Sequence, residues 1–332
     1  MPKSNKINIF FCIFLVVCII FVSVAPIYIL PKVYKNYSFD MLNREDGVFL
    51  ELWEVDTFEG GTNSRSMFLE NVAIAFEKKN SGVFVVVRNL TLDQLKLMLS
   101  QEKLPDMLSF GIGAGELVRA FCNTIEWSGN EIRNTMLESG AYKNQQLAIP
   151  WCMGGYVLCS TNTDVNQEID ATKTFGVGVE NNVPPNNDFQ NVVKLATQYD
   201  AYKEYLAGNF DILIGTQRDF YRVSNKVSLG VMGQNFYHFV DNYTDLVQYL
   251  SVTTKDEKIQ SYATSFAKFL VGAQMQSKLK NIGMFSVGDE SIFKGSDYEQ
   301  FETAIMHINK FQNVFEDNAI LQDKKQKLYT NN

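Results

Sequence analysis

One stretch of the chain constrains the fold most: a short run with strand periodicity passes through a polar turn into a run with helical periodicity. Apolar residues alternate from Val48 to Trp53 and recur at helical spacing from Phe68 to Phe76. The turn between them, residues 56–64, carries acids, glycines and hydroxyls. In open α/β sheets, ligands bind at such turns, between the carboxyl end of a strand and the amino end of a helix. We therefore expect an α/β protein with a ligand site at this edge.

The same unit repeats immediately downstream. Residues 83–87 are β-branched and almost uniformly apolar, which is typical of a strand buried on both faces of a parallel sheet. Residues 91–94 form a capping box that opens a helix, and residues 107–110 predict a third strand. Alternating strands and helices within about sixty residues predict a doubly wound lobe.

A second apolar stretch, residues 145–160, predicts two short strands that meet at Gly154-Gly155, where the chain would cross between lobes. The later segments repeat the local patterns of the first lobe. We expect a surface loop over 161–188, helices over 189–196 and 202–208, a strand over 210–214 that ends in a polar turn at 215–219, and a second capping box at 254–257.

The first thirty residues form a separate segment. Lys3 and Lys6 precede an apolar run over residues 7–30, which is close to the ~20 residues that cross a bilayer. We expect a retained membrane anchor with the body of the protein outside the cytoplasm. Two alternatives stay open: cleavage before Pro26, after which the protein would be secreted, and lipidation of Cys18.

Composition excludes some function classes. The formal net charge of −7 argues against nucleic-acid binding, which needs a basic face. The spacing of the cysteines and the two histidines does not match a zinc site, and we expect neither a metal nor a cofactor. We expect Cys122, Cys152 and Cys159 to be small buried apolar residues. The glycine-rich turn at 111–115 lacks the third glycine of a dinucleotide fingerprint, so tight turn geometry is the better interpretation.

Six stretches of the chain, in order, resemble the extracellular solute-binding proteins of family 1, the carbohydrate receptors of bacterial ABC importers. They are LWEVDTFEGGTNSRSMFLENVAIAFEKKN, LPDMLSFG, IPWCMGGYVL, FDILIGTQRDFYR, YTDLVQYLSVT and AKFLVGAQMQSKLKNIGMFSV. The resemblance implies a two-lobed type 2 periplasmic-binding-protein fold whose second lobe is shorter than usual. The implied organisation is an anchor over 1–30, a tether over 31–47, lobe one over 48–157 and 247–286, lobe two over 158–246 and 287–323, and a polar tail over 324–332.

Carried onto this chain, the resemblance implies aromatic and polar residues that would hold a sugar in the cleft between the lobes. Flat aromatic faces suit the C–H faces of a pyranose, and carboxylates or guanidinium groups suit its hydroxyls. Each candidate also has a purely structural alternative in a lobe core, a turn cap or a surface ion pair. The candidates are Trp53, Asp56, Glu59, Phe110, Trp151, Arg218, Asp219 and Tyr249.

The resemblance implies a membrane-tethered receptor that presents a carbohydrate to ABC permease subunits and catalyses no reaction. The alternative is a sensor or protein-interaction module on a degenerate scaffold of the same kind. A glycosidase that uses Asp56 and Glu59 is disfavoured, because two acids on one turn do not flank a scissile bond.

Overall fold

The body of the chain contains two five-stranded mixed sheets, in a computed structural model that describes residues 14–15, 47–161, 172–178, 184 and 191–316. The predicted anchor, tether and polar tail lie outside these residues, apart from Phe14, Leu15 and Gly47, so they stay predictions. Among the described residues, no helix combines the length and apolar character that a membrane span needs. The chain divides into two compact units, residues 49–80 with 85–332 and residues 1–48 with 81–84, and every residue of the site below belongs to the first.

The first sheet has the strand order β2-β1-β3-β12-β6. Its core strand β1 pairs parallel with β3, and β12 pairs antiparallel with both β3 and β6. Most strand residues are buried, as the apolar runs predict. The strands are β1 (Val48–Asp56), β2 (Val83–Thr91), β3 (Met107–Gly111), β6 (Ile149–Met153) and β12 (Val247–Val252).

The two helices that follow β1 and β2 each begin at a hydroxyl N-cap. The N-cap of α3 (Arg65–Lys79) is Ser64, and α4 (Leu92–Ser100) has the expected capping box at Thr91. Helix α9 (Glu257–Val271) packs against α3 through Phe76 and Phe266, whose ring centroids lie 5.3 Å apart. Short helical segments complete the path of the chain: α5 (Gly115–Val118), η1 (Arg119–Phe121), α6 (Asn134–Glu138), α10 (Ala273–Gln276) and η2 (Leu279–Ile282), with a small hairpin of β4 (Ala141–Tyr142) and β5 (Gln145–Gln146).

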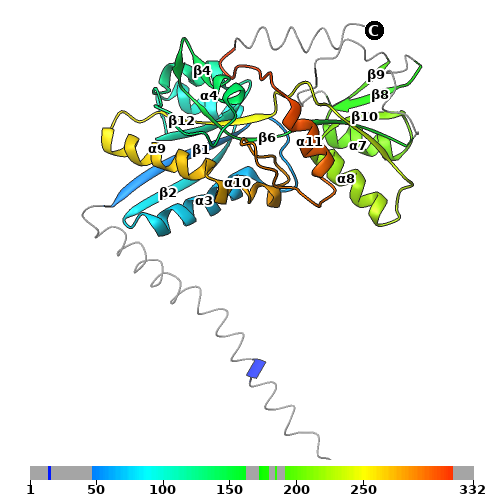
Figure 1. Ribbon diagram of the computed structural model, residues 1–332, viewed down its shortest axis with the longest axis horizontal. Helices are drawn as coiled ribbons and strands as arrows, with labels where there is room; N and C mark the ends of the chain where they lie inside the picture. Colours follow the sequence, from blue (N-terminus) through cyan, green and yellow to red (C-terminus); the bar gives the residue numbers. More distant parts are fainter. Residues whose placement is uncertain (1–13, 16–46, 162–171, 179–183, 185–190, 317–332) are drawn as a thin grey trace, which may run out of the picture. The chain divides into compact units, whose positions relative to one another are not determined.

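The second sheet has the order β11-β7-β10-β8-β9. Its strands are β7 (Tyr156–Ser160), β8 (Phe175–Gly178), β9 (Val192–Leu195), β10 (Ile212–Thr216) and β11 (Phe236–Phe239). Helices α7 (Gln198–Leu206), α8 (Gln217–Ser228) and α11 (Glu299–His307) contact its strands, and Figure 1 shows α7 and α8 beside β8 to β10.

The chain passes from one sheet to the other at Gly154-Gly155, as predicted. β6 belongs to the first sheet and β7 to the second, and only these two glycines separate them. A return connection runs from β11 to β12. Two α/β lobes joined in this way confirm the predicted fold class, whereas the predicted domain limits and the reduced second lobe stay predictions.

The structure corrects the expected loop over 161–188, because residues 175–178 form the buried strand β8. Its glycines permit close packing: a Cβ on Gly176 would lie 2.0 Å from the Phe210 ring, and one on Gly178 would lie 2.2 Å from the Gln198 backbone. The expected helix over 189–196 is also wrong, since Val192–Leu195 is the parallel strand β9. Adjacent β-branched valines favour a strand beside β8 over an isolated helical turn.

The second predicted capping box places the N-cap of α9 two residues too early. Asp256 caps α9 by accepting a hydrogen bond from the backbone N–H of Ile259 at 3.0 Å, whereas Thr254 accepts one from the N–H of Asp256. Thr253 and Thr254 both donate backbone hydrogen bonds to the carbonyl of Asp106, so the chain is still extended there and the helix begins later.

Candidate functional site

The first side of the candidate site is the junction between β1 and α3. β1 ends at Asp56, residues 57–64 turn across the edge of the sheet, and Ser64 caps α3 by accepting a hydrogen bond from the N–H of Met67. Because β3 runs parallel to β1, its carboxyl end at Gly111 lies at the same edge. Polar groups from several strands therefore meet here.

Arg65 holds this junction together. Its guanidinium is buried and donates from Nε to Glu54 Oε1 at 3.2 Å and from Nη2 to Asp56 Oδ1 at 2.7 Å and the Phe58 carbonyl at 2.9 Å. The guanidinium carbon also lies 4.2 Å from the centroid of the Phe58 ring. The Arg65 side chain thus links the end of β1 to the loop that carries Glu59.

Glu54 is a fully buried carboxyl at the centre of this network. Burial raises its pKa to about 7, against the opposing effect of the positive charge on Arg65. Gln248 of β12 donates to Glu54 Oε1 at 3.1 Å. Three buried oxygens of the cluster have no hydrogen-bond partner among the described residues: Glu54 Oε2, Thr57 Oγ1 and Gln248 Oε1. These unused acceptors at the sheet edge suit a donor from a bound polar molecule or water.

The second side is the junction between β10 and α8. The expected turn over 215–219 is wrong here, because β10 runs directly into α8 at Thr216. Thr216 and Asp219 form a capping box, in which the N–H of Thr216 donates to Asp219 Oδ2 at 3.0 Å. Asp219 is fully buried and also accepts from Gln198 Nε2 at 2.9 Å and Arg222 Nη1 at 3.0 Å. Burial raises its pKa, and Arg222 opposes that effect.

Glu59 connects the two junctions. Its Oε1 accepts a hydrogen bond from Arg222 Nη2 at 2.8 Å and forms an ion pair with Arg218 Nε at 3.2 Å. Burial raises the pKa of Glu59 and the negative charge of Asp219 adds to the effect, while the two arginines oppose it. The structure therefore brings together three predicted site residues, Glu59, Arg218 and Asp219, from the two sheets.

The other five predicted site residues lie apart from this contact. Asp56 is half-exposed and pairs with Arg65 and Asn89. The four aromatic candidates, Trp53, Phe110, Trp151 and Tyr249, are each at most 2% exposed. Two of them have polar partners in the core: Trp151 Nε1 donates to Ser109 Oγ at 3.0 Å, and the Tyr249 hydroxyl lies 2.7 Å from Ser139 Oγ. The Trp151 ring stacks on Phe68, and Trp53 Nε1 is buried without a hydrogen-bond partner among the described residues. In this conformation none of the four presents a face to a sugar, and their ligand role stays a prediction.

Two residues absent from the sequence-based candidates belong to the site. Arg222 pairs with both Glu59 and Asp219, and the exposed ring of Tyr199 lies 5.4 Å from its guanidinium carbon. The spacing of Asp219 and Arg222, three residues apart on one helix, is the signal that would have indicated Arg222.

Gln217 fixes the crossing between the sheets. Its Oε1 accepts from the N–H of Gly155 at 3.0 Å, and its Nε2 lies 3.2 Å from Met284 Sδ. The Tyr298 hydroxyl donates to the Gln217 carbonyl at 3.2 Å. The start of α8 is therefore anchored at the point where β6 passes into β7.

The three cysteines among the described residues are free thiols. Cys152 and Cys159 are buried free thiols whose pKa burial raises, as expected for small apolar residues, and Cys122 is half-buried with a pKa raised to about 11 by burial. Within the described part of the chain, no group of His, Cys, Asp and Glu residues is arranged to hold a metal ion.

Comparison with known proteins identifies the fold. No protein-family model and no curated protein sequence matches the chain. Solved structures do match: the GacH receptor of Streptomyces glaucescens, determined unliganded and with acarbose, has a TM-score of 0.63 and 11% identity over 86% of this chain and 93% of that one. The chain has the two-lobed fold of the ABC substrate-binding proteins. The sugar-binding protein MalE of Xanthomonas citri matches with a TM-score of 0.61 and 10% identity, over 86% and 91% of the two chains.

The same fold also accommodates ligands that are not sugars. Iron-bound HitA of Pseudomonas aeruginosa matches with a TM-score of 0.55 and 13% identity, over 85% of this chain and 99% of that one. At these identities the likeness establishes the arrangement of strands and helices alone, and the ligand must be argued from the residues of the site.

Proposed function

We propose that the protein is an extracytoplasmic receptor that captures a carbohydrate between its lobes and delivers it to an ABC importer, tethered to the membrane through residues 7–30. The observation that carries the proposal is the meeting of Glu59 with Arg218 and Arg222, which brings charged groups from two strand-to-helix junctions of different sheets to one place. Ligands of open α/β sheets bind outside the carboxyl ends of strands, where these residues lie.

The chemistry of the junctions suits hydroxyl groups. Carboxylates and guanidinium groups form directed hydrogen bonds to a polyol, and the exposed ring of Tyr199 beside Arg222 offers a flat face. The proposed receptor carries out no covalent step, because binding and lobe closure suffice for its task.

Isothermal titration calorimetry against acarbose, maltotriose and xylotriose tests this function. We expect saturable binding of at least one saccharide and about tenfold weaker binding by the Arg222→Gln variant, since a charge-assisted hydrogen bond is lost. Lys226→Gln, which changes a charge on the same helix but outside the Glu59 contact, is the control and should bind like the wild type. Folded protein that binds no saccharide in a wider panel would contradict the proposal.

One observation favours a second function, a sensor or protein-interaction module. Glu59 already has two arginine partners with no ligand present, and the four aromatic candidates are buried in the lobe core. A site in which Glu59 Oε1 and the two arginines already pair with one another can lose its solute and keep the scaffold. Permease genes beside the gene for this protein would favour transport, and a histidine kinase gene beside it would favour sensing.

A further inference from the structure

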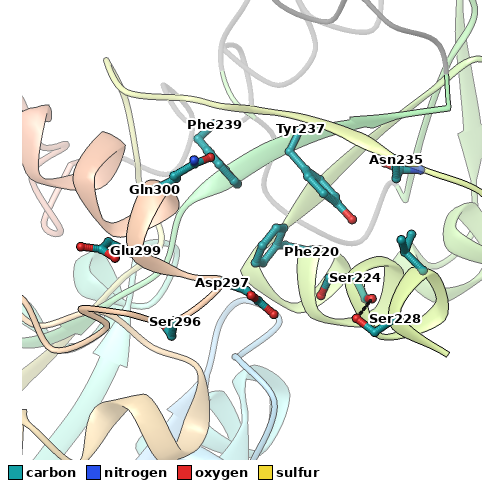
Figure 2. Close-up of a pocket in the computed structure, with 11 residues that line it drawn as sticks. Phe220, Ser224, Ser228, Asn235, Tyr237, Phe239, Ser296, Asp297, Glu299 and Gln300 are labelled. Atoms are coloured by element: carbon teal, nitrogen blue, oxygen red, sulfur yellow. Dashed lines mark hydrogen bonds between the residues drawn. The ribbon is translucent and has the colours of Figure 1, made fainter.

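A separate cavity of about 490 Å³ lies in the second lobe, between α8, β11 and the segment that begins α11 (Figure 2). Glu59, Arg218 and Arg222 do not line it. The residues on its walls come from α8, from the neighbouring segment over residues 235–239 and from residues 296–300, which are distant in sequence from the other two. It is therefore a distinct feature from the site between the two junctions.

Aromatic rings form one wall of the cavity. The ring of Phe220 lies 4.9 Å from that of Tyr237 and 5.4 Å from that of Phe239, both in edge-to-face geometry. Figure 2 shows the three rings together above α8. Tyr237 and Phe239 are only half-buried, so the wall offers aromatic surface to a ligand.

The serine hydroxyls around the cavity are available only as acceptors. Ser224, Ser228 and Ser296 all line it, and each donates its hydroxyl proton to a backbone carbonyl, at 3.2, 2.9 and 2.6 Å respectively. The Ser296 oxygen also accepts a hydrogen bond from the N–H of Tyr298 at 3.3 Å, whereas the oxygens of Ser224 and Ser228 can accept from a ligand. A molecule that binds here must therefore supply hydrogen-bond donors.

Asn235 gives the strongest indication of a missing partner. Its side chain lines the cavity, is 8% exposed and donates from Nδ2 to the Tyr205 hydroxyl at 2.6 Å. Its Oδ1 is buried and has no hydrogen-bond partner among the described residues. A buried carbonyl oxygen without a donor is destabilising, so a donor from a ligand would be favourable.

The charge of the cavity has one sign. Asp297 and Glu299 line it, and among the described lining residues none is a lysine, arginine or histidine. Burial raises the pKa of Tyr237, so its hydroxyl adds no charge to this wall. The two carboxylates outweigh the partial charge of about +0.5 at the first turn of α11.

We propose that this cavity binds a protonated amine carried on an aromatic or other flat apolar body. An ammonium group supplies three hydrogen-bond donors and no acceptor, which matches the accept-only serine oxygens and Asn235 Oδ1. Its charge is complementary to Asp297 and Glu299, and an ammonium group is attracted to aromatic faces. The proposal is independent of the carbohydrate function assigned to the site between the lobes.

Titration with phenethylamine tests the proposal, with 2-phenylethanol as the neutral compound of nearly the same shape. Saturation-transfer NMR and calorimetry at pH 7.4 should show saturable binding of the amine and at least about tenfold weaker binding of the alcohol. Asp297→Asn, a change at an exposed residue that leaves the core intact, should weaken the binding of phenethylamine by about fivefold. Glu70→Gln, which removes an exposed carboxylate on α3, is the matched control and should leave its affinity unchanged.

Three results would overturn the proposal. They are equal binding of the amine and the alcohol, equal binding by the wild type and the Asp297→Asn variant, and the absence of saturable amine binding. If the Glu59→Gln variant no longer binds the amine while the Asp297→Asn variant still does, the amine binds between the two junctions, and this result would also contradict binding in the cavity. Loss of amine binding would leave the saccharide titrations unaffected, so the two proposals fail separately.

Discussion

The two strand-to-helix junctions of the molecule use the same pair of groups for different purposes. At each junction a fully buried carboxyl pairs with an arginine of the helix that follows: Glu54 with Arg65 after β1, and Asp219 with Arg222 after β10. Arg65 forms all its hydrogen bonds with residues of its own junction. Arg222 donates one hydrogen bond to Asp219 at its own junction and one to Glu59 at the junction of the other sheet.

The exposure of the two arginines explains the difference. The side chain of Arg65 is 1% exposed and that of Arg222 is 16% exposed. A buried guanidinium needs charge partners nearby, since an unpaired buried charge is costly, and Arg65 finds them through Nε and Nη2, although its Nη1 has no partner among the described residues. A partly exposed guanidinium such as that of Arg222 can pair with Glu59 at the other junction and can exchange this partner for a ligand. The first junction is therefore a rigid support, and the second is the side that would respond to a ligand.

The largest effect that tests this comparison is the loss of Arg65. Arg65→Met leaves Glu54 buried without its charge partner, and we expect the free energy of unfolding to fall by about 3–5 kcal/mol. Urea denaturation followed by circular dichroism measures the change. Lys78→Met, an exposed change on the same helix, should stay within about 0.5 kcal/mol. A loss below about 1 kcal/mol for Arg65→Met would show that the first junction is not a rigid support.

A smaller effect is expected at the second junction. Asp219→Asn keeps the shape of the side chain but replaces one acceptor oxygen by a donor that faces N–H groups, so we expect a loss of about 1–3 kcal/mol. The same denaturation experiment applies, with the exposed change Asp241→Asn as control. Equal stability of the wild type and the Asp219→Asn variant would mean that the buried carboxyl does not hold the start of α8.

The pH dependence of stability distinguishes the junctions further. The pKa of Glu54 is about 7 in the folded protein and near 4.5 when unfolded, so between these values the folded state binds the proton more tightly. Stability contributed by this group is fully present below about pH 4.5 and is lost as the pH rises through 7.

Glu54→Gln should remove this trend. Between pH 4.5 and pH 8, the unfolding free energy of the wild type should fall by about 3 kcal/mol relative to that of the Glu54→Gln variant. Chemical denaturation at a series of pH values measures it. A difference that stays constant over the range would show that Glu54 does not titrate there.

Much of the fold follows from local patterns in the sequence. Thr91 caps its helix as predicted, because capping depends on residues three positions apart. The crossing at Gly154-Gly155 is also marked locally by two apolar runs on either side of the glycines. The strand at Phe175–Gly178 was not predictable in this way, since its glycines accommodate Phe210 and Gln198 from other elements.

The site was harder to predict than the fold. Glu59 and Arg222 are 163 residues apart, and no local pattern indicates that they meet. The aromatic candidates show the opposite problem: the sequence identifies Trp151 and Tyr249 as apolar, but the choice between a lobe core and a ligand face depends on packing with Phe68, Ser109 and Ser139. The structure places both in the core.

A distance measurement between the lobes tests whether a saccharide binds between the two junctions and moves the lobes. Spin labels at cysteines introduced at Glu70 on α3 and Asn225 on α8, both exposed, would report on the two lobes. With a saccharide that binds in the titrations above, we predict that the electron–electron distance distribution narrows and shifts by more than about 2 Å. An unchanged distribution at saturating saccharide would contradict the account.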